Sequence, residues 1–349
     1  MSRRGLTLLI AGGLVVVLAL VAFALPVPYV VLVPGPLTDT LGTVGSTQVI
    51  SVTGAQTYAD GGHLYLTTVG VIPGSCDKDP KLDEALRAWF NKHEAVQPKQ
   101  AICPPGQTSQ AVQQQNVDEM TQSQQDAVIA ALTYLHYKPV TQHISIGSVS
   151  QDAPSAPLLH TGDLILSIDG TAVTGLDQLH SLISAHPAGS TLSLTLNRHG
   201  RQLDVQAKTY SDSGRTILGF QPDLSATFKG VDVKIGIDPN SVGGPSAGLA
   251  FTLGIIDKLT PGSLSGGRTV AATGTIDGFG QVGPIGGIQQ KIAGAAARHA
   301  TVFLAPASEC AEARAAAPKS MVLVKVDTLA TAVKALESIA AGHTDFPSC

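Results

Sequence analysis

Residues 6–25 form the longest apolar stretch of the chain, a run of 20 residues without a charged side chain. A helix of that length is sufficient to cross the hydrocarbon core of a bilayer. Arg3 and Arg4 stand directly before it, and this positive charge predicts a cytoplasmic N-terminus with the rest of the chain outside. A cleaved signal peptide is the alternative, because Ala22-Phe23-Ala24 is typical of a small-residue cleavage site. In both interpretations the bulk of the chain is exported.

The residue pattern over 29–137 predicts short strands followed by two helices. Runs rich in β-branched and aromatic residues indicate strands at 48–52 and 63–69. Apolar positions at three-four spacing predict a helix over 81–93 and a longer one over about 110–137. The apolar faces of both helices are expected to pack into the core. In the first helix that face consists of Leu82, Leu86, Trp89 and Phe90.

The pattern of apolar and polar residues changes again at about residue 138 and at about residue 210. Residues 138–209 read as short strands between turns, and residues 210–349 alternate strands with helices, as in a mixed α/β domain. In the first segment strands are expected at 144–149, 164–168, 191–197 and 202–207, with a helix at 176–185. In the second, strands are expected at 231–237, 268–275, 302–304 and 322–326, and helices at 247–259, 288–299 and 329–339.

These elements predict a multidomain fold of α/β and β-rich class. The expected regions are a cytoplasmic stub with a transmembrane anchor at 1–28, an extracytoplasmic α+β region at 29–137, and two domains at 138–209 and 210–349.

The composition of the chain limits which partners are expected. The chain has a net charge of -4 and no run of Lys and Arg interleaved with aromatic residues, so nucleic acid is not expected as a partner.

The four cysteines of the chain can oxidise in an exported protein, and no zinc-ligand spacing occurs. Three pairings are open. The local pairs Cys76–Cys103 and Cys310–Cys349 are favoured, and four free buried thiols are the alternative.

The segment 243–248 reads Gly-Gly-Pro-Ser-Ala-Gly and immediately precedes an apolar helix. Pro245 suits a helix start, and Ser246 would lie beside free backbone N–H groups at the positive end of the helix dipole. Such donors can hold the oxyanion of an acyl transfer. The small neighbours Gly244 and Ala247 would let a substrate carbonyl approach. A simple helix-capping serine is the alternative.

A serine hydroxyl needs a base, and no histidine motif accompanies Ser246. Lys291 lies in the first turn of a helix that is apolar and small on most sides, where it carries Ile288, Ile292, Ala293, Ala295 and Ala296. Loss of hydration on such a surface would lower its pKa toward neutrality and let it act as a general base. The alternative is a lysine whose head reaches water.

Both segments, together with Thr273-Gly274 between them, resemble the proteolytic domain of the Lon family. That family has a Gly-Pro-Ser-Ala-Gly motif, followed some forty-odd residues later by a lysine after Pro-Ile-Gly-Gly. Here Lys291 follows Pro284-Ile285-Gly286-Gly287 and lies 45 residues after Ser246. The resemblance implies Ser246 as nucleophile, Lys291 as base and Thr273 as a residue that positions the lysine. A strand threonine without a role is the alternative for Thr273.

The chain departs from ATP-dependent Lon at three positions beside these residues. They are Gly243, Thr275 and Gln289, where that family carries an acidic residue, a glutamate and a basic residue. None of the three is part of the dyad, but each could alter its polarity. No GxxxxGK[ST] phosphate loop occurs in the sequence, so ATP and other cofactors are not expected.

The segment 161–170, Thr-Gly-Asp-Leu-Ile-Leu-Ser-Ile-Asp-Gly, with 153–156 before it, resembles a PDZ domain. PDZ domains bind extended peptides at a sheet edge, which implies a protein or peptide partner. The usual glycine-rich carboxylate loop is not evident before Ile144, so recognition of a chain end is not expected. A groove that takes extended chain is still expected. A β-rich spacer without a ligand is the alternative.

The order of these regions resembles bacterial membrane-anchored PDZ–Lon-type peptidases. The resemblance implies a serine endopeptidase outside the cytoplasmic membrane that cleaves unfolded or flexible segments without ATP. It also implies contact with the lipid bilayer and allows a homo-oligomeric ring. Two other functions stay open: a PDZ adaptor that does not cut, and an envelope assembly factor that interacts through residues 81–137.

Overall fold

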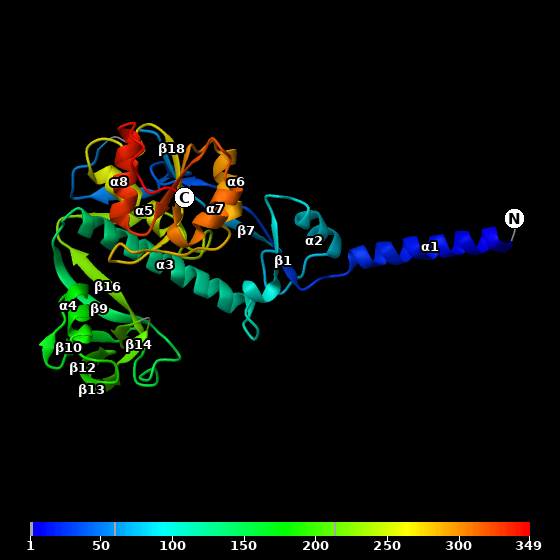
Figure 1. Ribbon diagram of the computed structural model, residues 1–349. Helices are drawn as coiled ribbons and strands as arrows, with labels where there is room; N and C mark the ends of the chain where they lie inside the picture. The colour runs from blue at the N-terminus through cyan, green and yellow to red at the C-terminus, as the bar shows by residue number, and fades with distance from the viewer. Residues whose placement is uncertain (1–2, 59–60, 213) are drawn as a thin grey trace.

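The computed structural model describes residues 3–58, 61–212 and 214–349. Its first element, α1 (Arg3–Ala24), extends away from the rest of the chain (Figure 1). Over the described residues, no helix combines the length and the hydropathy needed to cross a membrane. The transmembrane helix expected over residues 6–25 is therefore not supported.

A small three-stranded sheet follows α1. β1 (Tyr29–Pro34) lies in its centre, antiparallel to β7 (Val69–Ile72) on one side and to β8 (Ala95–Pro98) on the other. The helix α2 (Leu82–Trp89) contacts both β1 and β8 and joins this sheet to the end of α1.

The helix α2 buries a different face from the expected one. Its buried residues are Ala85 and Ala88. Leu86, Trp89 and Phe90 are 39%, 72% and 86% exposed, so the expectation that they pack into the core is wrong. The two alanines let the helix approach the small sheet closely, and the larger apolar side chains face outward.

The C-terminal half of the chain forms an α/β body around a five-stranded sheet, which carries the largest core. The last four strands run parallel, and the first is antiparallel to its neighbour. In spatial order the strands are β2 (Thr38–Asp39), β6 (His63–Leu66), β18 (Thr269–Ala272), β21 (Val302–Pro306) and β22 (Val322–Val326).

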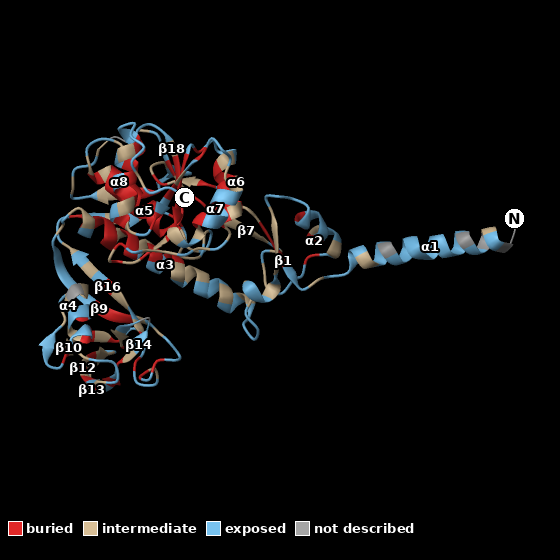
Figure 2. Cartoon of the chain, viewed as in Figure 1, coloured by how far each residue is buried: buried red, intermediate tan, exposed pale blue. Residues whose placement is uncertain are grey.

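Segments before residue 137 complete this body. β6 pairs with β18, and β5 (Ile50–Thr53) pairs with β17 (Asp232–Ile235). The long helix α3 (Ser109–Tyr134) packs against α5 (Gly248–Leu259), which is buried along nearly its whole length (Figure 2). The region expected at 29–137 is therefore divided. β1, β7, β8 and α2 form the small sheet and its helix, whereas β2, β5, β6 and α3 supply part of the α/β body.

Three further helices cover the sheet, and α7 among them was not expected from the sequence. They are α6 (Ile288–Ala297), α7 (Cys310–Ala316) and α8 (Leu329–Ala340). The shorter strands are β3 (Thr43–Val44), β4 (Thr47–Gln48), β11 (Thr171–Ala172), β14 (Tyr210–Asp212), β15 (Arg215–Ile217), β19 (Thr275–Ile276) and β20 (Val282–Gly283).

The PDZ-like domain has its own sheet and its own core. The sheet order is β13 (Arg201–Lys208), β12 (Thr191–Arg198), β10 (Leu164–Ile168), β9 (Pro139–Val149) and β16 (Phe220–Phe228), with α4 (Leu176–Ser184) beside it. β16 pairs with β9 along its length, so the sheet of this domain takes in a strand from beyond residue 209. It is inserted between α3 and β17, which both belong to the α/β body.

Two disulfides fasten loops and the C-terminus. The pairs are Cys76–Cys103 and Cys310–Cys349, the same two pairs that the sequence favoured. The second pair ties the last residue of the chain to the start of α7.

Candidate active site

Ser246 lies in the turn that leads into α5. Gly244 has a left-handed φ of 83°, which a glycine adopts without strain, and its N–H donates to the carbonyl of Asn116 over 2.9 Å. The Ser123 hydroxyl donates to the carbonyl of Pro245 over 2.9 Å. Both partners come from α3, so this long helix holds the turn that presents the half-buried Ser246.

Lys291 reaches the same point from the first turn of α6. Its Nζ donates to Ser246 Oγ over 2.7 Å and to Thr273 Oγ1 over 3.0 Å. The residue is only 2% exposed. Burial lowers the pKa of Lys291 to about 7, and the negative charge of Glu309 opposes this shift. The amine is therefore neutral part of the time near neutral pH.

Thr273 and Gly274 fix the backbone of Ser246 from the other side. The Thr273 hydroxyl donates to the Ser246 carbonyl over 3.2 Å, and the Gly274 N–H donates to the same oxygen over 3.0 Å. The Gly274 carbonyl in turn accepts from Leu249 in the first turn of α5. Thr273 thus contacts both members of the Ser246–Lys291 pair.

Backbone donors lie next to the serine. Within the described residues, the N–H groups of Ser246 and Ala247 make no hydrogen bond, so both can donate to an incoming oxygen. The adjoining Ala247 and Gly248 are buried and small, and they precede a helix whose dipole favours negative charge at its start. The geometry can stabilise an oxyanion beside Ser246.

The structure brings together the predicted residues Ser246, Lys291 and Thr273, with Gly244, Pro245 and Ala247 in the same turn. The four cysteines lie outside this group. Sequence reasoning missed three residues that act on the pair: Asn116, Ser123 and Glu309. No motif marks them, because they approach from α3 and from the segment before α7. Among the described residues, no cluster of His, Cys, Asp and Glu could hold a metal ion.

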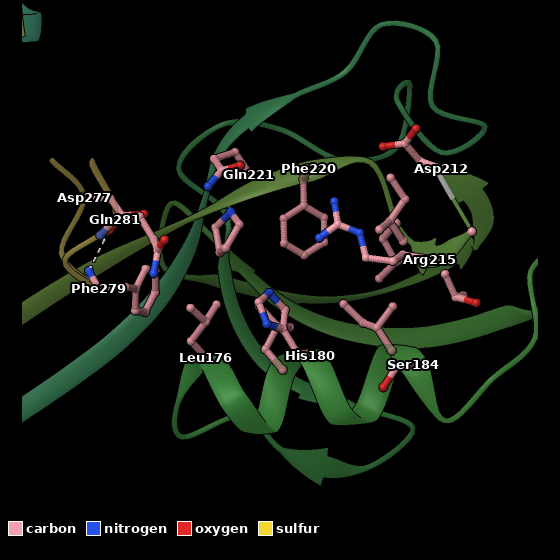
Figure 3. A pocket seen from close by; sticks show the side chains of 17 residues that line it. Leu176, His180, Ser184, Asp212, Arg215, Phe220, Gln221, Asp277, Phe279 and Gln281 are labelled. Carbon is pink, nitrogen blue, oxygen red and sulfur yellow. Dashed lines mark hydrogen bonds between the residues drawn. The ribbon is translucent and has the colours of Figure 1, made fainter. Parts of the chain in front are cut away.

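A hairpin connects the two halves of this site along the chain. It consists of β19 and β20 with the tip 277–281, and it starts directly after Gly274 and ends before the turn that begins α6. Asp277 Oδ1 accepts from the N–H groups of Phe279 and Gln281, over 3.0 and 2.8 Å, and closes the tip. The tip forms part of the wall of a cavity of about 790 Å³ beside α4 (Figure 3).

Comparison with known proteins agrees with this geometry. Residues 206–337 match the family model of the Lon protease (S16) C-terminal proteolytic domain, and residues 121–209 match that of the PDZ domain. The chain therefore combines a PDZ domain with a Lon-type (S16) proteolytic domain, and this match supports a serine peptidase. Lon protease 1 of Bacillus subtilis (strain 168) is 33% identical to this chain over 152 residues, which cover 42% of the chain and 19% of that protein.

A second relative matches a shorter stretch of the chain. The serine protease Do-like HtrA of Lactobacillus helveticus is 35% identical over 66 residues, 19% of this chain and 16% of that protein. The chain thus spans about a fifth or less of the length of either relative. Among solved structures, the PDZ domain of the SdrC-like protein from Listeria monocytogenes is 25% identical, covers 24% of this chain and 92% of its own, and has a TM-score of 0.23.

Proposed function

We propose that this protein is an ATP-independent serine endopeptidase in which Ser246 is the nucleophile and Lys291 the general base. The observation that carries the proposal is the 2.7 Å contact between Lys291 Nζ and Ser246 Oγ at a lysine that is 2% exposed. A lysine with a pKa of about 7 can take up and release a proton at neutral pH.

The proposed reaction follows from these contacts. Neutral Lys291 accepts the proton of Ser246 as Oγ forms a bond to the scissile carbonyl carbon. The carbonyl oxygen becomes an oxyanion that the N–H groups of Ser246 and Ala247 stabilise. Protonated Lys291 then donates its proton to the leaving amine, and the peptide C–N bond breaks. In the second half of the reaction Lys291 activates a water molecule, which releases the acyl group and restores the serine. Thr273 keeps Nζ aligned throughout.

Unfolded or flexible segments are the proposed substrates. The 349 residues contain no phosphate-binding loop, which supports cleavage of segments that are already accessible. The PDZ domain supports a protein or peptide partner, because such domains bind extended chain. A homo-oligomeric ring stays a prediction from the resemblance alone.

We place the catalytic body outside the cytoplasm. Its two disulfides, Cys76–Cys103 and Cys310–Cys349, support this, because such bonds persist in oxidising compartments and are rare in the cytosol.

The test is cleavage of a reduced, carboxymethylated protein with and without ATP. The parent is compared with Ser246→Ala and Lys291→Ala, and with the matched controls Ser241→Ala, in the preceding turn, and Lys325→Ala, on an exposed face. We expect equal cleavage with and without ATP, loss in both dyad variants and parent-like rates in both controls. Cleavage that survives Ser246→Ala would overturn the assignment, and no cleavage by the folded parent would favour a non-cutting PDZ adaptor.

A further inference from the structure

The side-chain nitrogen of Lys291 has three directions besides the bond to its own Cε, and hydrogen bonds fill two of them. One direction faces Ser246 Oγ over 2.7 Å, and another faces Thr273 Oγ1 over 3.0 Å. Among the described residues, Nζ makes no third hydrogen bond. A protonated lysine carries three donors, whereas a neutral lysine carries two and a lone pair. The third direction therefore decides where the lone pair of the neutral amine points.

Thr273 accepts a hydrogen from this amine and gives none to it. Its own hydroxyl hydrogen goes to the carbonyl of Ser246 over 3.2 Å, so Oγ1 offers a lone pair to Nζ. One hydrogen of the neutral amine is used in this contact. The other hydrogen goes either to Ser246 Oγ or into the third direction. Only in the second case does the lone pair face the serine hydroxyl, as a general base requires.

A buried hydroxyl group lies at the level of this amine in the neighbouring strand. β6 and β18 run parallel with Leu66 beside Ala272, so Thr67 lies beside Thr273 one residue further along. Side chains alternate between the two faces of a sheet, and residues at the same level of parallel strands share a face. Thr67 is therefore on the face of the sheet where Thr273 contacts Lys291.

The packing of the preceding residues agrees with this orientation. Leu66 and Ala272 belong to the core that contains α5. Tyr65 and Ala271, one residue earlier in each strand, pack instead with Ile288 of α6. Because the side chains alternate, the residue that follows each pair returns to the α6 side of the sheet.

The start of α6 rests on the segment that carries Thr67. Gly287, the N-cap of this helix, has a left-handed φ of 68°. A Cβ at this glycine would lie 2.7 Å from Val69 Cγ2 and 3.4 Å from Gln290 Oε1. Residues 67–69 therefore lie against the helical turn from which the Lys291 side chain arises.

Thr67 is buried without a partner for its hydroxyl group. The residue is 1% exposed, and its Oγ1 makes no hydrogen bond within the part of the chain that the structure describes. The buried Nε2 of Gln290, on the residue before the lysine, is unpartnered in the same way. An unpartnered polar group in the interior costs stability. A valine would fill the same space without this cost, so packing alone does not explain a hydroxyl at position 67.

We propose that Thr67 is a positioning residue of the dyad: its hydroxyl accepts the hydrogen in the third direction of the Lys291 amine, directly or through one water molecule, and so directs the lone pair at the hydroxyl of Ser246. The inference rests on the proposed function of Ser246 and Lys291. Without this acceptor the amine donates its second hydrogen to Ser246 Oγ, and its lone pair faces away from the nucleophile. After proton transfer the same acceptor stabilises the ammonium group.

The first experiment compares two neighbouring threonines in the full chain. Thr67→Val keeps the shape of the side chain and removes the hydroxyl. We expect kcat for a short fluorogenic peptide to fall about tenfold with little change in KM, while Tm stays equal or rises. The matched control is Thr68→Val, which removes a hydroxyl that donates to the carbonyl of Pro36 over 2.7 Å. This control should lower Tm and leave kcat near that of the parent.

The conservative change Thr67→Ser keeps the hydroxyl and should restore kcat. An unchanged kcat in folded Thr67→Val would overturn the proposal, and so would a loss of kcat that Thr67→Ser shares. If Thr67→Val does not fold, Thr67→Ala replaces it, and equal kcat in Thr67→Ala and Thr67→Ser would overturn the proposal.

The second experiment follows the amine itself and needs no turnover. Lysine labelled with ¹³C at Cε is incorporated, and the Lys291 resonance is assigned by its absence from Lys291→Arg. The ammonium loses an acceptor in Thr67→Val, so its titration midpoint should move to lower pH by about half a pH unit or more. Glu309, the charged group that acts on Lys291, is the same in every sample.

The two proposals fail in different ways. A midpoint in Thr67→Val that equals or exceeds that of the parent would overturn the role of Thr67, whether or not the protein cleaves peptides. Acylation of Ser246 by a small activated ester is measured on the parent in parallel. If the parent does not acylate at Ser246, the proposed function fails, and the positioning role fails with it.

Discussion

Lys291 Nζ lies 2.7 Å from Ser246 Oγ and 3.0 Å from Thr273 Oγ1, so one buried amine contacts two hydroxyl groups. Burial lowers the pKa of Lys291 to about 7. The base is the neutral amine, so kcat/KM should rise with pH through about 7 and then level off. A profile of kcat/KM from about pH 5 to about pH 10 measures this directly. A rising limb near the ordinary lysine value would mean that Lys291 is solvated in the working enzyme.

Glu309 provides a second check of the same base. Its charge raises the pKa of Lys291 against the larger effect of burial. Removing that charge in Glu309→Gln should therefore move the rising limb of kcat/KM to lower pH. Glu312→Gln, on the exposed surface of α7, is the matched control and should leave the limb in place. A shift toward higher pH in Glu309→Gln would contradict the electrostatic account.

The buried carboxyl group of Asp126 should make the stability of the protein depend on pH. It is 7% exposed, and burial, followed by the charge of Asp223, raises its pKa from 3.8 to about 7. The folded protein favours the protonated form, so the stabilisation is complete below about pH 3.8 and is lost as pH rises through about 7. Asp223 and Asp277 lie nearby, and burial raises the pKa of each in the same direction.

Asp126→Asn removes this dependence while keeping an acceptor for Gln122. We expect the free energy of unfolding to increase by roughly 1–3 kcal/mol at about pH 8 and to change little at about pH 4. Urea unfolding at both pH values measures it. The exposed Asp118→Asn, on the same helix, should show no such difference. Destabilisation at the higher pH would show that the charged form is the favoured one.

Ser123 should affect catalysis although its side chain does not contact the substrate. Its hydroxyl holds the Pro245 carbonyl, and Pro245 precedes the nucleophile. Ser123→Ala should lower kcat about tenfold, leave KM nearly unchanged, and cost about 1 kcal/mol of unfolding free energy for the lost hydrogen bond. Thr121→Ala, an exposed residue on the same helix, is the control. A loss of stability with unchanged kcat would make Ser123 structural only.

Removal of the Cys310–Cys349 disulfide should lower the stability of the protein and leave the active site intact. It closes a loop with a sequence separation of 39, for which the chain-entropy model gives about 3–4 kcal/mol. The double change Cys310→Ala/Cys349→Ala should therefore lower Tm clearly, while kcat at a temperature below the transition stays near that of the parent. Thermal unfolding and cleavage of a short peptide are measured on the same sample. An unchanged Tm would show that the packing of the C-terminus already restrains the chain.

Local elements could be predicted wherever burial leaves a simple pattern. The strand at Leu164–Ile168 and the strand at Val322–Val326 have the expected bounds, because aliphatic runs between turn residues mark buried strands. α2 shows the limit of this reasoning. Periodicity defined an apolar face, but the core is made by Ala85 and Ala88, and only tertiary packing decides which face is buried.

Pairings between distant segments could not be predicted in the same way. Nothing in the local pattern of β6 indicates that β18, far along the chain, is its partner. β16 was missed because Pro222 and Asp223 interrupt its alternation, and a bulge accommodates them. For the site, motif spacing indicated Ser246 and Lys291, whereas Ser123 and Glu309 carry no motif and become visible only once the chain is folded.

The most direct measurement of the central claim is the position of the acyl group during turnover. The full chain is mixed with the p-nitrophenyl ester of a short apolar peptide, quenched in acid, digested and analysed by mass spectrometry. The account predicts an acyl adduct on Ser246, none in Ser246→Ala, and adduct formation slowed by about 100-fold or more in Lys291→Ala. An adduct on another residue, or an undiminished rate in Lys291→Ala, would contradict it.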